Sequence, residues 1–139
     1  MKKLSLMIAL GSFVFLSIAK PAINATTFET YSKQMQAMTA QYMQEKKFDV
    51  AGKAIAKWIE TYEALADKEK AAHRTTYAAA MYQQACSYAQ TNEMFKALKS
   101  LKEAVKNGYS NKNEALNDPN LAPLKSYSEF NKIIDSIKG

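Results

Sequence analysis

Apolar residues recur at intervals of three and four positions through most of the chain after residue 25. This spacing places them on one face of an α-helix. In a first segment, about residues 27–46, they are Phe28, Tyr31, Met35, Met38 and Tyr42. In a second, about residues 49–66, they are Ala51, Ile55, Trp58, Ile59 and Tyr62. The short connection between the two segments predicts antiparallel neighbouring helices.

The second half of the chain has the same spacing. A helix is predicted at about residues 70–90, with Tyr77, Met81, Ala85 and Tyr88 on one face. Another is predicted at residues 93–106, with Met94, Leu98, Leu101 and Val105, and a last helix carries Phe130, Ile133, Ile134 and Ile137. Good helix formers dominate and no useful stretch alternates like a strand. We therefore predict an all-α protein with antiparallel helical hairpins at about 27–66 and 70–107 and a C-terminal capping helix in a segment at about 118–138.

Polar residues predict where these helices begin and end. Thr26 with Glu29, and Ser126 with Glu129, have the spacing of capping boxes. The other signals are Asp49 and Asn92 as caps, Asn107-Gly108 as a stop, and Asp118-Pro119 as a cap with a first-turn proline.

The first 25 residues have the layout of a secretory signal peptide. Lys2 and Lys3 precede a sixteen-residue apolar run, which Lys20-Pro21 ends, and Ala25 is a small residue at a cleavage point. A membrane-spanning helix needs about 20 apolar residues, so an uncleaved anchor is the weaker interpretation. Cleavage after Ala19 is a further alternative. The prediction is an exported protein, periplasmic or extracellular, with one domain at 26–139 and no stable membrane span after processing.

Loss of the signal peptide changes the charge of the chain. Its formal net charge of +6 falls to +3, because Lys2, Lys3 and Lys20 are removed with no acid. So small a charge, and export, argue against nucleic acid as a partner. Cys86 is the single cysteine, so no disulfide forms within the chain. It is expected to be a small apolar residue on a helix, and pairing between chains is the alternative.

The two predicted hairpins match when the chain is shifted by 46 residues. The shift aligns Tyr42 with Tyr88, Phe48 with Met94, Ala51 with Ala97, and Ile55 with Leu101. Small residues at such places let two helices approach closely, and larger ones fill the space to the next hairpin. The chain is therefore expected to contain two related hairpins.

The second hairpin, from Ala78 to Ser110, resembles the tetratricopeptide repeat. The residues that carry the resemblance are Ala85, Tyr88, the Thr91-Asn92 turn, Met94, Ala97, Leu101 and Ala104. The first hairpin is a poorer match, with Thr39 and Trp58 at places where the family has small residues, and the step of 46 exceeds the family's usual one. The tail from Asn117 to Phe130 resembles a closing segment found after such repeats in bacterial proteins. This resemblance implies a cap over the last hairpin.

The sequence offers no set of residues for catalysis, a cofactor or a metal. His73 is the only histidine, and Glu69, one helical turn away, gives at most two metal ligands where zinc needs three or four. There is no glycine-rich phosphate loop and no nucleophile beside a base. Lys96, Lys99, Lys102 and Lys106 form a stripe on one helix. A solvated outer face is the expected interpretation of this stripe, and contact with an anionic surface is the alternative.

The resemblance implies a groove that binds a protein or peptide. Its groove-facing residues would be Lys33, Gln36, Ala40 and Met43 in the first hairpin, and Ala79, Tyr82, Cys86 and Gln90 in the second. Met43 and Tyr82 are the expected apolar anchors, although either residue type is more often found in a core. The sequence thus predicts an exported binding or scaffold module that is not an enzyme. The alternative is a non-catalytic accessory subunit of an envelope enzyme or transport complex.

Overall fold

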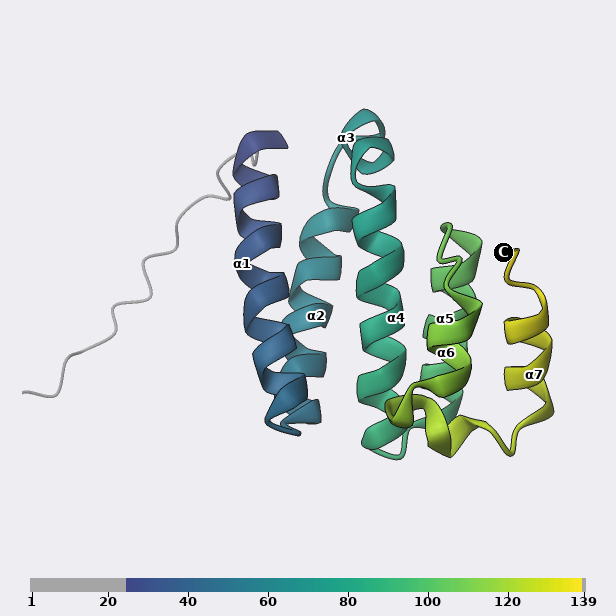
Figure 1. Ribbon diagram of the computed structural model, residues 1–139. Coiled ribbons are helices and arrows are strands. Elements are labelled where there is room, and N and C mark those ends of the chain that lie inside the picture. The colour runs from purple at the N-terminus through teal and green to yellow at the C-terminus, as the bar shows by residue number, and fades with distance from the viewer. Residues whose placement is uncertain (1–24, 139) are drawn as a thin grey trace, which may run out of the picture.

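The computed structural model describes residues 25–138, which form eight helices and no strand (Figure 1). The helices are α1 (Ala25–Gln44), α2 (Phe48–Glu63), α3 (Asp67–Ala72), α4 (Arg74–Gln90), α5 (Met94–Lys106), α6 (Lys112–Asn117), the 3₁₀ helix η1 (Pro119–Leu124) and α7 (Ser128–Asp135). The prediction of an all-α protein is confirmed for this part of the chain. The predicted signal peptide lies outside the described residues, except for Ala25.

The four long helices stand side by side with alternating direction (Figure 1). The helix α4 is central, because it packs against α2 on one side and against α5 and η1 on the other. The pairs α1–α2 and α4–α5 are antiparallel, at the places where the apolar pattern predicts two hairpins. The helices α6, η1 and α7 follow α5, and η1 and α7 cover its free side and part of α4.

The turns of the two hairpins have the same conformation. Lys46 and Asn92, which are 46 residues apart, are the two non-glycine residues with positive φ in the described part of the chain, at 57° and 64°. In each turn the next backbone N–H, of Lys47 or Glu93, donates to the carbonyl five residues earlier at 2.8 Å. This is the Schellman arrangement that ends a helix in a left-handed residue. Asn92 therefore ends α4. The sequence suggested Asn92 as a cap for the next helix, but it does not cap α5.

Two clusters form the core. The larger one joins α4 and α5 to η1 and α7, and Ala85, Ala97 and Leu101 lie at its centre with no exposed surface. The smaller one is aromatic and joins α1, α2 and the start of α4 through Phe28, Trp58, Tyr62 and Tyr77, together with Leu65. The Trp58 indole N–H donates to the Ser32 hydroxyl at 2.8 Å, so the polar edge of this ring is satisfied.

The predicted helix at 70–90 is divided at His73, where α3 ends and α4 begins. His73 leaves helical geometry at φ −109° and ψ 14°. The Phe28 ring packs edge-on against the His73 ring at 4.9 Å, and the Tyr62 hydroxyl donates to the Lys70 carbonyl at 3.0 Å. A continuous helix would use that carbonyl for the N–H of residue 74. The aromatic cluster therefore stabilises a break that helix periodicity alone does not reveal.

The predicted helix ends are confirmed in part. Gly108 follows α5 with φ 106°, and the Asp118 carboxylate accepts from the Asn120 N–H at 2.8 Å ahead of Pro119. Three other predicted caps are wrong. The helix α1 begins before Thr26, and Asp49 lies within the first turn of α2. The helix α7 follows Tyr127, without a capping hydrogen bond from Ser126. The short helix α6, capped by Asn111, occupies what was predicted to be a loop.

Candidate functional site

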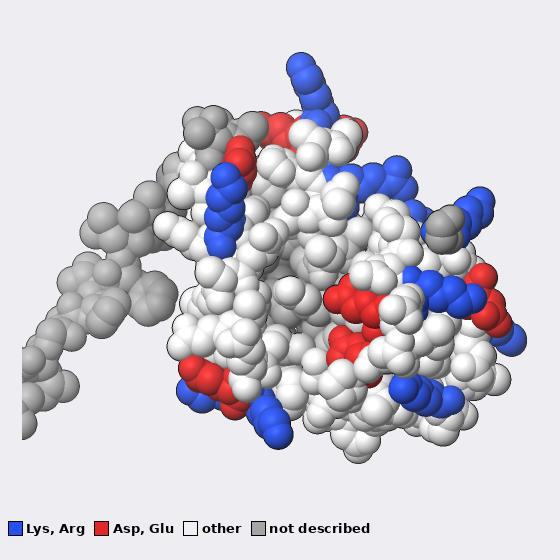
Figure 2. Space-filling view, viewed as in Figure 1, with Lys and Arg blue, Asp and Glu red and all other residues white. Residues whose placement is uncertain are grey.

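A groove of about 300 Å³ opens between α1 and α4, with α2 at its floor. We call it the α1–α4 groove. Its walls and floor are formed by Met35, Gln36, Thr39 and Ala40 of α1, Ile55 and Trp58 of α2, and Thr76, Ala79, Ala80 and Gln83 of α4. None of these residues is charged. In Figure 2 the surface between α1 and α4 is hollowed and white, with charged side chains around it.

The polar groups of this groove are amides and hydroxyls. Gln36 and Gln83 lie on opposite walls, on α1 and α4. The buried Thr39 hydroxyl donates to the Met35 carbonyl at 2.9 Å and lies 3.5 Å from Gln83 Oε1. A side-chain amide both donates and accepts hydrogen bonds, as a peptide group does. The groove therefore combines an apolar floor with amides that match an extended backbone.

Residues predicted for the first hairpin are partly brought together in this groove. Gln36 and Ala40 line it, with Ala79 of the second hairpin opposite them. Lys33 is exposed and forms an ion pair with Glu29 at 2.7 Å, outside the groove lining. Met43 is partly buried and packs against the larger core cluster, outside the groove lining.

Residues predicted for the second hairpin are covered by the chain itself. Tyr82 donates its hydroxyl to Asp118 Oδ2 at 2.7 Å, and the Cys86 thiol lies 3.4 Å from the same oxygen. The Gln90 amide donates to the Asn120 carbonyl at 3.0 Å. The prediction that Tyr82, Cys86 and Gln90 face an open groove is wrong, because the segment leading into η1 lies across this face.

Burial controls the ionisation of the residues under this segment. It is the main cause that raises the pKa of Tyr82, Cys86 and Tyr109 above their ordinary values. The Asp118 carboxylate raises the pKa of Tyr82 and Cys86 further, and the Tyr109 ring stacks on Tyr82 at 4.3 Å. Cys86 is therefore held as a neutral thiol, which is a poor nucleophile. It is a small buried residue on a helix, as the sequence predicted.

Alkaline conditions are expected to destabilise the protein through this cluster. Above about pH 9 the unfolded chain loses the Cys86 and tyrosine protons while the folded chain keeps them, so the free energy of unfolding falls as pH rises. The measurement is the urea midpoint at pH 8 and at about pH 10.5. The double variant Cys86→Ala/Tyr82→Phe removes two of these groups and should lose less stability over the same range. An equal loss in both proteins would contradict this explanation.

Glu69 and His73, the two conceivable metal ligands of the sequence, each contact another group of the fold. The Glu69 carboxylate accepts from the Ala66 N–H at 3.3 Å and caps α3, while the His73 ring packs on Phe28. Within residues 25–138 no three His, Cys, Asp or Glu side chains gather in a way that would hold a metal ion. Among the same residues, no helix is long and apolar enough to cross a membrane.

The lysine stripe of α5 is largely paired with carboxylates. Lys96 pairs with Glu93, Lys102 lies 3.7 Å from Glu129, and Lys106 lies 3.8 Å from Glu103. These acids lie on α5, on α7 and in the turn before α5. The pairing favours a solvated outer face over an anionic-surface contact for this stripe.

No protein-family model matches the chain, and neither the curated proteins nor the solved structures contain a significant match to it.

Proposed function

We propose that this protein is a non-catalytic binding module of tetratricopeptide type, and that its α1–α4 groove holds an extended, uncharged peptide segment of a protein partner. The observation that carries the proposal is a groove without charged lining residues that has an amide on each wall. The two hairpin turns with the same conformation, 46 residues apart, support a repeat origin. The proposal includes export, because residues 1–25 have the sequence pattern of a signal peptide.

The same lining argues against a charged peptide end as the ligand. A carboxylate taken out of water needs a cation or several donors to offset its lost hydration. The groove supplies amides, hydroxyls and apolar surface, and Lys33, which is not among its lining residues, is paired with Glu29. An internal segment with small or aliphatic side chains is therefore the ligand that this surface fits best.

The test uses a phage-displayed library of random short peptides selected on the protein. Ala79→Arg places a long charged side chain in the groove and should weaken the selected peptides by at least about 10-fold. Ala71→Arg is the matched control, since Ala71 is exposed on α3 and outside the groove lining. Peptides with free and with amidated C-termini should bind equally. Binding that survives Ala79→Arg, or that requires a free carboxylate, would reject the proposed site.

A further inference from the structure

A second groove lies across the α2–α4 contact from the first. It has a volume of about 600 Å³ and runs between α2 and α5 over α4, and we call it the α2–α5 groove. It is lined by Ala56, Ile59, Glu63, Tyr77, Met81, Gln84, Tyr88, Lys96, Lys99, Ser100 and Glu103. Ala56, Gln84 and Tyr88 also line a smaller hollow of about 210 Å³, which extends to Gly52 and Ser87. Unlike the α1–α4 groove, this one combines apolar, amide and charged side chains.

Gln84 is the unusual residue of this groove. Its side chain is 3% exposed, and its Oε1 has no hydrogen-bond partner among residues 25–138. The neighbouring Ser87 hydroxyl is already committed, since it donates to the Phe48 carbonyl at 2.6 Å. A buried amide without its hydrogen bonds lowers stability, and an apolar side chain of similar size would avoid that cost. The amide is therefore better explained by a group that comes from outside the chain.

Gly52 gives the Ser87 hydroxyl room beside this amide. A Cβ at position 52 would lie 3.8 Å from Gln84 Nε2 and would clash with the Ser87 hydroxyl. The two ends of a glutamine amide exchange places by a half-turn of the terminal group. Such a turn directs the acceptor oxygen to where the nitrogen now lies without any movement of a helix.

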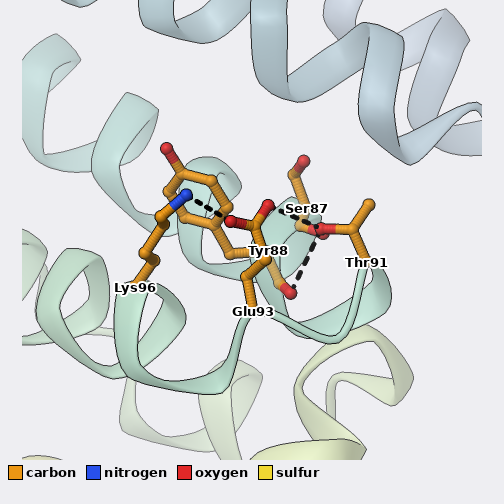
Figure 3. A network of polar contacts seen from close by, with 5 residues as sticks. All are labelled: Ser87, Tyr88, Thr91, Glu93 and Lys96. Atoms are coloured by element: carbon orange, nitrogen blue, oxygen red, sulfur yellow. Dashed lines mark hydrogen bonds and ion pairs between the residues drawn. The ribbon is translucent and has the colours of Figure 1, made fainter.

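The two ends of the groove differ in charge. At one end, Tyr77 lies near Glu63 and Glu103, and burial first and then these two carboxylates raise the pKa of its hydroxyl to about 12. At the other end, Lys96 lies 5.3 Å from the centre of the Tyr88 ring and pairs with Glu93 (Figure 3). Thr91 bridges this end by contacting Glu93 Oε1 at 3.5 Å and the Ser87 carbonyl at 3.1 Å. Glu103 already pairs with Lys106 at 3.8 Å, and Lys96 and Lys99 line the groove as well, so Glu63 is the carboxylate at the Tyr77 end that is open to a basic group.

We propose that the α2–α5 groove is a second binding site, which takes an extended peptide segment with a lysine or arginine side chain. After the half-turn of the amide, an N–H group of the segment donates to Gln84 Oε1, and the basic side chain lies beside Glu63. The apolar stem of that side chain packs on Ile59 and Met81, as long basic side chains do on apolar surfaces. The two grooves lie on different faces of α4, so the protein can hold two segments at once.

The first arm of the test measures stability without any ligand. Gln84→Met keeps the length of the side chain and removes the unsatisfied amide, so the melting temperature should rise by about 4 °C. Gln83→Met is the matched control, because the neighbouring Gln83 is more exposed and faces the other groove. A lower melting temperature for Gln84→Met would show that the amide is satisfied within the fold, and would overturn the proposal.

The second arm uses a phage-displayed library of random short peptides. One set of selected peptides should contain lysine or arginine, bind the Ala79→Arg variant normally, and lose at least about 10-fold affinity on Gln84→Met and on Glu63→Gln. Recovery of no such set, or equal binding to these two variants, would overturn the inference. Ala79→Arg blocks only the α1–α4 groove. If peptides do not bind one of the two grooves, the binding measured at the other groove is therefore unaffected.

Discussion

Replacing Ala97 with phenylalanine should lower the free energy of unfolding by about 3 kcal/mol. Ala97 lies on α5 with no exposed surface, in the same core cluster as the fully buried Ala85 of α4. Helices that approach through small residues have no room for a ring, so the added atoms would push α4 and α5 apart. Urea denaturation followed by circular dichroism measures the change.

Ala64→Phe is the matched control for this experiment. Ala64 follows α2, is exposed, and falls outside the pattern that the two hairpins share. The same substitution at this position should change the free energy of unfolding by less than about 0.5 kcal/mol. Unfolding of Ala97→Phe at the wild-type urea concentration would show that the α4–α5 contact is not the close crossing that the repeat alignment requires.

Replacing Tyr82 with alanine should cost about 4 kcal/mol of stability, in the range for loss of a large buried aromatic residue. The ring is 6% exposed and stacks on Tyr109, and its hydroxyl bonds to Asp118. Its removal leaves a cavity under η1 and deprives the Asp118 carboxylate of a donor. Thermal and urea unfolding measure the loss, and faster proteolysis after residue 108 would locate it in the covering segment.

Two variants separate the ring of Tyr82 from its hydroxyl. Tyr82→Phe keeps the stacking and removes one hydrogen bond to a carboxylate, which should cost about 2 kcal/mol. Tyr127→Ala, at an exposed tyrosine, should cost little. If Tyr82→Ala unfolded like the wild type but weakened peptide binding, Tyr82 would be the partner anchor that the sequence suggested and not a core residue.

The hairpins were predictable because each is encoded locally. The apolar spacing defines the four long helices, and the Lys46 and Asn92 turns depend on residues within a few positions of each other. The break at His73 is different in kind, because it depends on Phe28 and Tyr62, which approach from two other helices. The apolar spacing of a helix does not show which of its backbone carbonyls will accept a hydrogen bond from a distant hydroxyl.

The residues of the candidate sites also fall into two groups, those that depend on local sequence and those that depend on distant segments. Gln36 and Ala40 follow from helical register, and the structure places them in the α1–α4 groove. Tyr82 and Cys86 have the same register, but Asp118, more than thirty residues later, covers them. The sequence identified Asp118 as a helix cap, and its second carboxylate oxygen bonds across the fold. Gln84 gave no signal, because a glutamine on a helix is normally a surface residue.

The cover formed by η1 and α7 also restricts how copies of this chain can associate. Open filaments need two different complementary edges on each molecule, whereas a single edge that joins to itself closes into a two-fold pair. Here one end of the helical stack is sealed by η1 and α7, and within the described residues α1 stands at the other end with Met38 and Val50 of the first hairpin exposed. Self-association that extends the helical stack would therefore use the first hairpin and not the side of α5 that η1 and α7 cover.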